Sequence, residues 1–312
     1  MKNQFHKIVI AGGTGFLGKV LQKYCYESTT EIVILTRGQS TVDSKIKYVN
    51  WDAKTFSGWE KHLEGADVLI NLTGKSVDCR YTEANKKIIL NSRIDSTAIL
   101  NQAVLQCLNP PKHWLNISTA TIYRFSLDKQ MDEYTGEIGS DFSMDVAKAW
   151  EQTFFGTTTP KTLKTALRTS IVLGHQGGAL VPLKKITLMG FGGKQGPGNQ
   201  LISWIHEQDF ARAVAHIIQQ KIIGPVNIVS PKPISNQDFM SKLRAHLNRP
   251  FGIAVSNRLL HFAAFLIQTE PELVLKSRNV IPKKLIKNGF QFEFDTLDKA
   301  LKSLTSTKSC FK

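Results

Sequence analysis

The run of glycines at residues 12–18 constrains this chain more than any other feature of its sequence. Residues 8–11 are apolar and long enough for one buried strand, and the heptapeptide Gly-Gly-Thr-Gly-Phe-Leu-Gly follows directly. Apolar residues then recur at helical spacing as far as Cys25. A strand, a glycine turn and a helix in this order form the unit on which many α/β proteins bind the pyrophosphate of a dinucleotide.

The glycines have separate roles in such a unit. Gly12 makes the tight turn, Gly15 lets the backbone approach the phosphates, and Gly18 packs the helix against the strand. The N–H groups at the start of the helix then hold the anion. A glycine-rich turn without a ligand is the alternative, but the flanking strand and helix favour a nucleotide site. The residues expected to contact the cofactor here are Gly12, Gly13, Thr14, Gly15, Phe16, Leu17 and Gly18.

A second apolar run, residues 31–35, ends in Thr36 and Arg37, which we also expect to contact the cofactor. Arg37 stands where an NAD-selective site carries Asp or Glu for the ribose 2′-hydroxyl. A guanidinium suits a 2′-phosphate instead, because it can donate two parallel hydrogen bonds. A surface arginine in a loop is the alternative. Because a nucleotide site precedes it, Arg37 predicts NADP(H) as the cofactor.

The alternation of strands and helical spacers continues as far as residue 173. Strands are expected at 45–50, 66–72, 113–118 and 166–173, and helices at 82–108 and 141–156. This alternation predicts an α/β fold with a Rossmann-like, doubly wound parallel sheet, whose carboxyl edge lines the cofactor crevice. Further cofactor contacts are expected from Asn71, Leu72, Thr73, Gly74, Lys87 and Ser92, with Asp52 near the adenine.

Beyond residue 173 the alternation stops, and a smaller C-terminal substrate lobe is expected. The predicted domains are an NADP-binding domain over 1–173, to which 206–224 return, and a lobe over 174–205 and 225–312. The glycine-rich stretch 190–198 matches neither phosphate-loop pattern, which indicates a flexible loop on the substrate side. The apolar stretch Leu259–Ile267 is too short to span a bilayer and predicts a core helix. Helix starts are expected at Ser235, Ser256, Pro282 and Thr296.

Charge and cysteine content narrow the class of partner. The net charge is +15, but the basic residues are dispersed and form no run of four. We therefore expect an anionic small molecule as ligand, and neither nucleic acid nor a membrane as partner. The four cysteines lack metal-ligand spacing, so we expect free thiols, no metal site and a cytoplasmic location.

Several motifs together are similar to those of one known family. They are GGTGFLG at 12–18, NLTG at 71–74, NSRI at 91–94, RTSIVLG at 168–174 and PKKLIKNGFQF at 282–292. On these motifs the chain resembles the extended short-chain dehydrogenases/reductases, and most closely the atypical epimerase-family branch with its own C-terminal domain. The resemblance covers nearly the whole chain. It implies an NAD(P)-binding protein that is a monomer or a homodimer.

The resemblance fails at the usual catalytic pair. Active members carry Tyr-x-x-x-Lys on the helix after the fifth strand, with a Glu four residues beyond the Lys. With Glu151 as that glutamate, Ser143 and Ala147 occupy the tyrosine and lysine positions. Lys148 is one residue off, about 100° around the helix. The remaining candidates for a catalytic proton donor are Thr119, Tyr123 and His206.

Two functions remain open on this sequence. One is an NADP(H)-dependent oxidoreductase or epimerase-like enzyme that uses a non-standard acid on an unidentified small molecule. The other is a non-catalytic NADP(H)-binding sensor or regulatory protein. Thr119 and the C-terminal lobe favour the enzyme, whereas the missing Tyr/Lys pair favours the sensor. Each candidate donor also has a structural alternative, which for Tyr123 is a ring packed beneath its loop.

Overall fold

A computed structural model describes residues 5–260, 270 and 275–306 of the chain. Its centre is an eight-stranded sheet in the order β11-β7-β6-β5-β1-β2-β4-β3, in which every strand but β3 runs parallel to its neighbours. The strands are β1 (Phe5–Ala11), β2 (Thr29–Thr36), β3 (Thr41–Asp43), β4 (Ile46–Asn50), β5 (Val68–Asn71), β6 (His113–Thr119), β7 (Leu163–Thr169) and β11 (Gly224–Ile228). The order steps outward from β1 in both directions, so the predicted Rossmann-like, doubly wound fold is confirmed.

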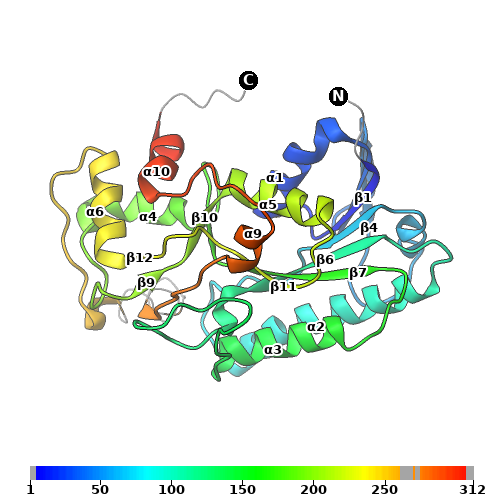
Figure 1. Ribbon diagram of the computed structural model, residues 1–312, viewed down its shortest axis with the longest axis horizontal. Coiled ribbons are helices and arrows are strands. Elements are labelled where there is room, and N and C mark those ends of the chain that lie inside the picture. Colours follow the sequence, from blue (N-terminus) through cyan, green and yellow to red (C-terminus); the bar gives the residue numbers. More distant parts are fainter. Residues whose placement is uncertain (1–4, 261–269, 271–274, 307–312) are drawn as a thin grey trace.

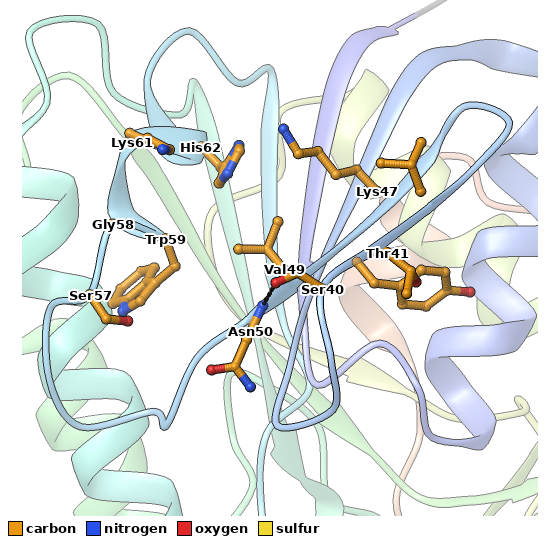
Figure 2. A pocket seen from close by; sticks show the side chains of 12 residues that line it. Ser40, Thr41, Lys47, Val49, Asn50, Ser57, Gly58, Trp59, Lys61 and His62 are labelled. Carbon is orange, nitrogen blue, oxygen red and sulfur yellow. Dashed lines mark hydrogen bonds between the residues drawn. The ribbon is translucent and has the colours of Figure 1, made fainter.

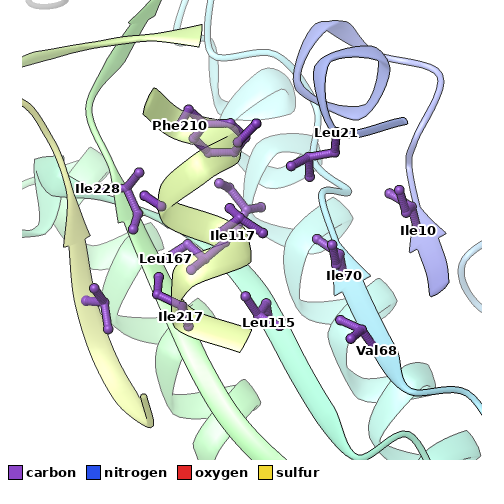
Figure 3. Packing of buried hydrophobic residues seen from close by; sticks show 14 of the residues in the cluster. Ile10, Leu21, Val68, Ile70, Leu115, Ile117, Leu167, Phe210, Ile217 and Ile228 are labelled. Carbon is purple, nitrogen blue, oxygen red and sulfur yellow. The ribbon is translucent and has the colours of Figure 1, made fainter. Parts of the chain in front are cut away.

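Helices cover both faces of this sheet (Figure 1). They are α1 (Phe16–Cys25) and α5 (Glu207–Gln219) on one face, and α2 (Glu83–Gln106) and α3 (Phe142–Phe155) on the other. Successive residues of a strand point to opposite faces, so the apolar residues of β1 pack alternately against the two layers. Figure 3 shows the face under α5, where Leu115 and Leu167 of the sheet pack with Ile217 of the helix.

The two long helices begin at the caps that the sequence predicts. The side chain of Thr82 accepts a hydrogen bond from the N–H of Asn85 at 3.2 Å, and that of Asp141 accepts one from Met144 at 2.8 Å. These bonds satisfy N–H groups that have no partner within the helix. The two helices lie side by side along one face of the sheet (Figure 1).

The C-terminal lobe is a smaller, separate core (Figure 1). Two short sheets support its helices: β8 (Ile171–Leu173) pairs with β10 (Trp204–His206), and β9 (Leu201–Ile202) pairs with β12 (Ile234–Ser235). The helices are α4 (Leu180–Ile186), α6 (Asn236–His246) and α10 (Leu297–Thr305). The remaining short elements are η1 (Tyr26–Ser28), η2 (Glu60–Leu63), η3 (Ala120–Ile122), η4 (Thr187–Phe191) and α9 (Lys283–Lys287).

Helix starts in the lobe agree with the sequence. Helices α6, α9 and α10 begin directly after Ser235, Pro282 and Thr296, as predicted. A helix also follows Ser256, of which residues 257–260 are described. Most of the helix predicted at Leu259–Ile267 lies outside the described residues, which stop at 260 and resume at 270.

One predicted boundary is wrong. Residues 225–228 were expected in the lobe, yet they lie in β11, which forms a five-residue parallel ladder with β7 at the edge of the main sheet. The strand predicted at 166–173 is also divided, because the chain leaves the main sheet at Ser170 and continues as β8 in the lobe. A short run of apolar residues does not reveal which strand it will pair with, so neither feature could be assigned from spacing alone.

Candidate cofactor and active site

The glycine loop between β1 and α1 has the turn geometry that the sequence predicts. Gly12 has a φ of +72°, and its N–H donates to the carbonyl of Leu35 in β2 at 2.9 Å. A Cβ on Gly18 would lie 2.1 Å from the carbonyl oxygen of Gly13, so only glycine lets the helix approach the strand this closely. Both positions therefore require glycine for the fold itself.

Gly15 leaves the start of α1 open. It is the N-cap residue of this helix, and among the described residues no side chain caps the first turn and no acidic residue lies in it. A Cβ on Gly15 would meet only the carbonyl oxygen of Gly12 within 4 Å, at 3.9 Å, and Thr14 beside it is exposed. Uncapped N–H groups, the positive end of the helix dipole and open space fit a pyrophosphate.

The side chain of Phe16 belongs to a different contact. A Cβ on Gly174 or Gly177 would come within 2.3 Å of its ring, and one on Gly178 within 2.9 Å. These three glycines form what we call the glycine cage, which holds the ring between α1 and the loop after β8. The side chain of Phe16 therefore packs against the loop after β8, and its neighbour Leu17 packs against the core of the sheet.

Arg37 is exposed just beyond the end of β2. The amide of Asn50 holds its loop by donating to the carbonyls of Arg37 at 3.3 Å and Gly38 at 2.8 Å. Within the described chain no carboxylate forms an ion pair with Arg37, which fits a guanidinium awaiting an anionic ligand. Asp52, expected near the adenine, is engaged by its own turn: hydrogen bonds from Thr55 and Lys54 lower the pKa of its carboxyl to about 2.

The turn after β5 is built on a buried polar network. Asn71 is fully buried, and its amide donates to Asn116 at 2.7 Å while its carbonyl oxygen accepts from the N–H of Thr73 at 3.1 Å. A Cβ on Gly12 would lie 3.1 Å from Thr73, so this turn directly abuts the glycine loop. Ser92 of α2 fixes the far end of the turn by accepting from the N–H of Lys75 at 2.9 Å.

The predicted contacts in this turn therefore divide by position. Asn71 and Ser92 position the backbone around Thr73 and Gly74. Of these two residues, Gly74 is exposed. Lys87 is exposed on α2, and in the described part of the chain it forms no ion pair. Of the predicted set, Thr73 lies directly against the glycine loop, and Gly74 follows it in the same turn.

The helix position of the usual catalytic lysine is closed. Ala147 is 0% exposed and belongs to an apolar cluster with Tyr123, Met131, Val229 and Val280. We call this set of residues the apolar plug. Because its members come from five separate segments, the space around Ala147 is filled by core packing rather than open to a ligand.

The neighbours of Ala147 on α3 do not replace the missing pair. Lys148 points into an ion pair with Asp145 at 2.7 Å on the exposed side of the helix. Ser143, at the tyrosine position, is only partly buried. The helical phase inferred from the sequence is therefore correct, and the Tyr/Lys arrangement is absent from α3.

Tyr123 is part of a buried network beneath β6. Its hydroxyl donates to Asn227 at 3.0 Å and accepts from Arg168 at 2.8 Å, and the residue is 1% exposed. Burial raises the pKa of the phenol, although Arg168 opposes the rise. Arg168 in turn holds Glu151 through two hydrogen bonds, from Nε at 2.8 Å and from Nη2 at 2.7 Å. Tyr123 therefore has the structural role that the sequence left open as an alternative to catalysis, with its side chain packed in the interior.

His206 is also buried, with 1% of its surface exposed. Its Nδ1 caps α5 by accepting from the N–H of Gln208 at 3.0 Å, and its ring stacks on Phe294 with centroids 3.6 Å apart. Burial lowers the pKa of the imidazole to about 3, so the ring is neutral at pH 7. Thr119 differs from both other candidates, because it ends β6 with a partly exposed side chain that accepts from the N–H of Thr121 at 3.1 Å.

Comparison with known proteins identifies the family. The family of NAD dependent epimerases/dehydratases matches residues 8–149, and a domain of unknown function, DUF1731, matches 259–304. The epimerase family protein YfhF of Bacillus subtilis is 30% identical over 96% of this chain and 98% of its own. The epimerase family protein SAR0825 of Staphylococcus aureus is 33% identical over 96% and 98%. The chain belongs to this epimerase family.

A solved structure of the epimerase family has the same fold. Human epimerase family protein SDR39U1 (isoform 2), crystallised with NADPH, superposes with a TM-score of 0.83 at 27% identity, over 96% of this chain and 99% of that one. The agreement extends over both the sheet and the lobe, since nearly the whole of each chain is covered. The predicted resemblance to an atypical extended short-chain dehydrogenase/reductase is therefore confirmed.

An open hollow of about 460 Å³ lies at the outer edge of the sheet, beside β4 and η2 (Figure 2). Lys47, Lys61 and His62 line its upper part in Figure 2, and burial together with the charges of the two lysines lowers the pKa of the imidazole. The hollow shares no residue with the glycine loop and lies on the far side of β2 from it. The hollow is therefore separate from the predicted nucleotide loop.

Over 5–260, 270 and 275–306, no three His, Cys, Asp or Glu side chains are grouped as a metal site requires. In the same part of the chain, no helix combines the length and apolar character needed to cross a bilayer.

Proposed function

We propose that this epimerase-family chain binds NADP(H) across the carboxyl edge of its sheet and transfers a hydride to or from an unidentified small molecule. The observation that carries this proposal is the open start of α1 at Gly15, where the uncapped helix leaves room for a pyrophosphate. The exposed Arg37 supports the 2′-phosphate form of the cofactor. The human relative crystallised with NADPH supports the same choice.

The roles of the chain's own residues follow from this placement. The N–H groups of α1 hold the pyrophosphate, Arg37 binds the 2′-phosphate, and the turn at Thr73 and Gly74 lies beside them. When bound, the cofactor supplies the hydride chemistry. We place the proton donor at Thr119, because Tyr123 and His206 are each 1% exposed and committed to buried contacts.

One specific observation favours the alternative of a non-catalytic NADP(H) sensor. The apolar plug around Ala147 occupies the place where active members of the superfamily keep their lysine. A carbonyl-substrate screen with NADPH separates the two functions. Turnover that falls by about 10²–10⁴ in Thr119→Ala but persists in Ser143→Ala supports the enzyme and its donor. Turnover lost only in Ser143→Ala would refute the assignment to Thr119.

The cofactor itself is tested by fluorescence titration with NADPH and NADH. We expect Arg37→Ala to weaken NADPH binding by about tenfold to a hundredfold, because a charged hydrogen-bonded contact is lost. NADH binding should be unchanged, and Lys302→Ala in α10 serves as a charge-matched control. Equal affinities for the two cofactors in the native protein, or a preference that survives Arg37→Ala, would overturn the NADP(H) assignment.

A further inference from the structure

Arg93 of α2 was not among the site residues predicted from the sequence. Its guanidinium lies beside the turn after β5. A Cβ on the exposed Gly74 would lie 3.2 Å from its Cζ, so the group sits directly beneath the turn after β5. Its Nη1 donates to the carbonyls of Lys75 at 3.1 Å and Ile89 at 2.9 Å. Its plane lies over the ring of Trp150, 5.0 Å from the centroid. The guanidinium is therefore fixed in position from three sides.

One edge of this guanidinium has no partner among the residues that the structure describes. Over the described part of the chain, neither Nε nor Nη2 of Arg93 donates a hydrogen bond, and no carboxylate pairs with it. The buried Arg168 illustrates how this edge of a guanidinium binds an anion, because its Nε and Nη2 donate to the two carboxylate oxygens of Glu151. Burial lowers the pKa of Arg93 to about 10, which still leaves it charged at neutral pH. A partly buried cation whose fork has no partner in the described part of the chain is a site for an oxyanion.

The sheet order places this fork on the second half of the crevice. Arg37 follows β2, on one side of β1, whereas Gly74 follows β5, on the other side. A dinucleotide whose pyrophosphate lies at the glycine loop extends over both sides. Arg93 therefore lies away from the 2′-phosphate and toward the nicotinamide half, where the substrate also binds.

We propose that Arg93 is an oxyanion-binding residue of the crevice, whose Nε–Nη2 edge receives two oxygens of one phosphate or carboxylate group. This inference rests on the proposed function and deepens it. Two sources supply the same chemistry: the nicotinamide-side phosphate of the cofactor, or an acidic group on the substrate. Helix α3 thus lacks the usual lysine, and α2 instead supplies a cation, Arg93, which binds an anionic group of the ligand.

The test compares Arg93→Lys and Arg93→Gln with the native protein, and with Lys86→Gln as a control on the same helix. The lysine variant keeps the charge but loses the fork, and thermal melting checks that each variant folds. Each protein is titrated with NADPH, with adenosine 2′,5′-bisphosphate, which lacks the nicotinamide half, and with sulfate in the absence and presence of NADPH.

If the bound group is a phosphate of the cofactor, both Arg93 variants should lower the affinity for NADPH by about tenfold to a hundredfold. The affinity for the bisphosphate should then stay unchanged. A substrate group as the source predicts unchanged NADPH affinity and loss of sulfate binding in both variants. Native affinity for NADPH and sulfate in folded variants would overturn the proposal. Failure of the native protein to bind NADPH would count against the proposed function alone, since sulfate binding by the free protein still tests Arg93.

Discussion

The glycine loop and the surroundings of Ala147 on α3 differ in how closely they are packed. At the glycine loop the helix is uncapped, Gly15 faces open space and Arg37 has no ion-pair partner among the described residues. On α3, by contrast, Ala147 at the usual lysine position is buried in the apolar plug, and Tyr123 of the same plug is held by Arg168. The difference teaches that this fold can keep an open glycine loop while the position of the usual catalytic lysine is packed shut.

A bonded network of polar side chains lies beside the apolar plug. The ion pair of Arg168 with Glu151 is buried on both sides, and Ser118 donates to the same carboxylate at 2.7 Å. Removing one partner of such a pair costs about 3–5 kcal/mol, because the other charge is left buried and unpaired. The carboxylate that follows the lost lysine position thus stabilises the fold rather than tuning a catalytic acid.

The largest expected effect breaks the open end. Gly15→Val should weaken NADPH binding by more than about a hundredfold while the fold survives, because φ is −75° there and a Cβ has room. Gly18→Ala is the matched control: its Cβ would strike the backbone of Gly13, so we expect lost stability. Calorimetry measures binding and circular dichroism measures folding. Unchanged affinity in Gly15→Val would place the nucleotide elsewhere.

The next effect tests whether the other end is truly closed. Ala147→Lys should lower the free energy of unfolding by about 3 kcal/mol or more, because it places an ammonium inside the apolar plug without a partner. Lys148→Ala, one residue further along, loses only a surface ion pair and should change stability by less than about 0.5 kcal/mol. Urea unfolding measures both. Native-like stability of Ala147→Lys would show an open pocket at this position.

The smallest effect concerns the pH dependence of His206. The folded imidazole has a pKa of about 3 and the unfolded one its ordinary value of 6.5, so acid favours unfolding. Its contribution is complete above pH 6.5 and is lost as the pH falls toward 3. Between pH 7 and pH 5 the native protein should lose about 2 kcal/mol more than His206→Asn, which keeps an acceptor for the α5 cap. Equal losses would indicate a solvent-accessible histidine, as a proton donor requires.

Local signals in the sequence predicted the fold well. The apolar runs, the glycines and the caps at Thr82 and Asp141 each act over a few residues, and the structure confirms the elements that they mark. The helical phase of α3 was equally local, so Ala147 could be assigned correctly. What depends on distant partners was missed: the pairing of β11 with β7 and the free edge of Arg93.

The candidate proton donors show the same limit. Tyr123 and His206 have chemically suitable side chains at suitable places along the chain, but their burial is decided by residues far away in sequence. Tyr123 meets Asn227, and His206 meets Phe294. The NSRI motif was a usable signal for Arg93, since this arginine stands inside one of the motifs that mark the family resemblance.

The glycine cage joins the loop between β1 and α1 to the lobe by direct packing. The ring of Phe16 belongs by sequence to the pyrophosphate loop, yet it is enclosed by the loop that leads from β8 into α4. Separating the two would return the ring to water at a cost of about 2 kcal/mol. Under the proposed function, a dinucleotide that stiffens the loop would also hold this part of the lobe in place, and by reciprocity the packing of the lobe would raise the affinity for the dinucleotide.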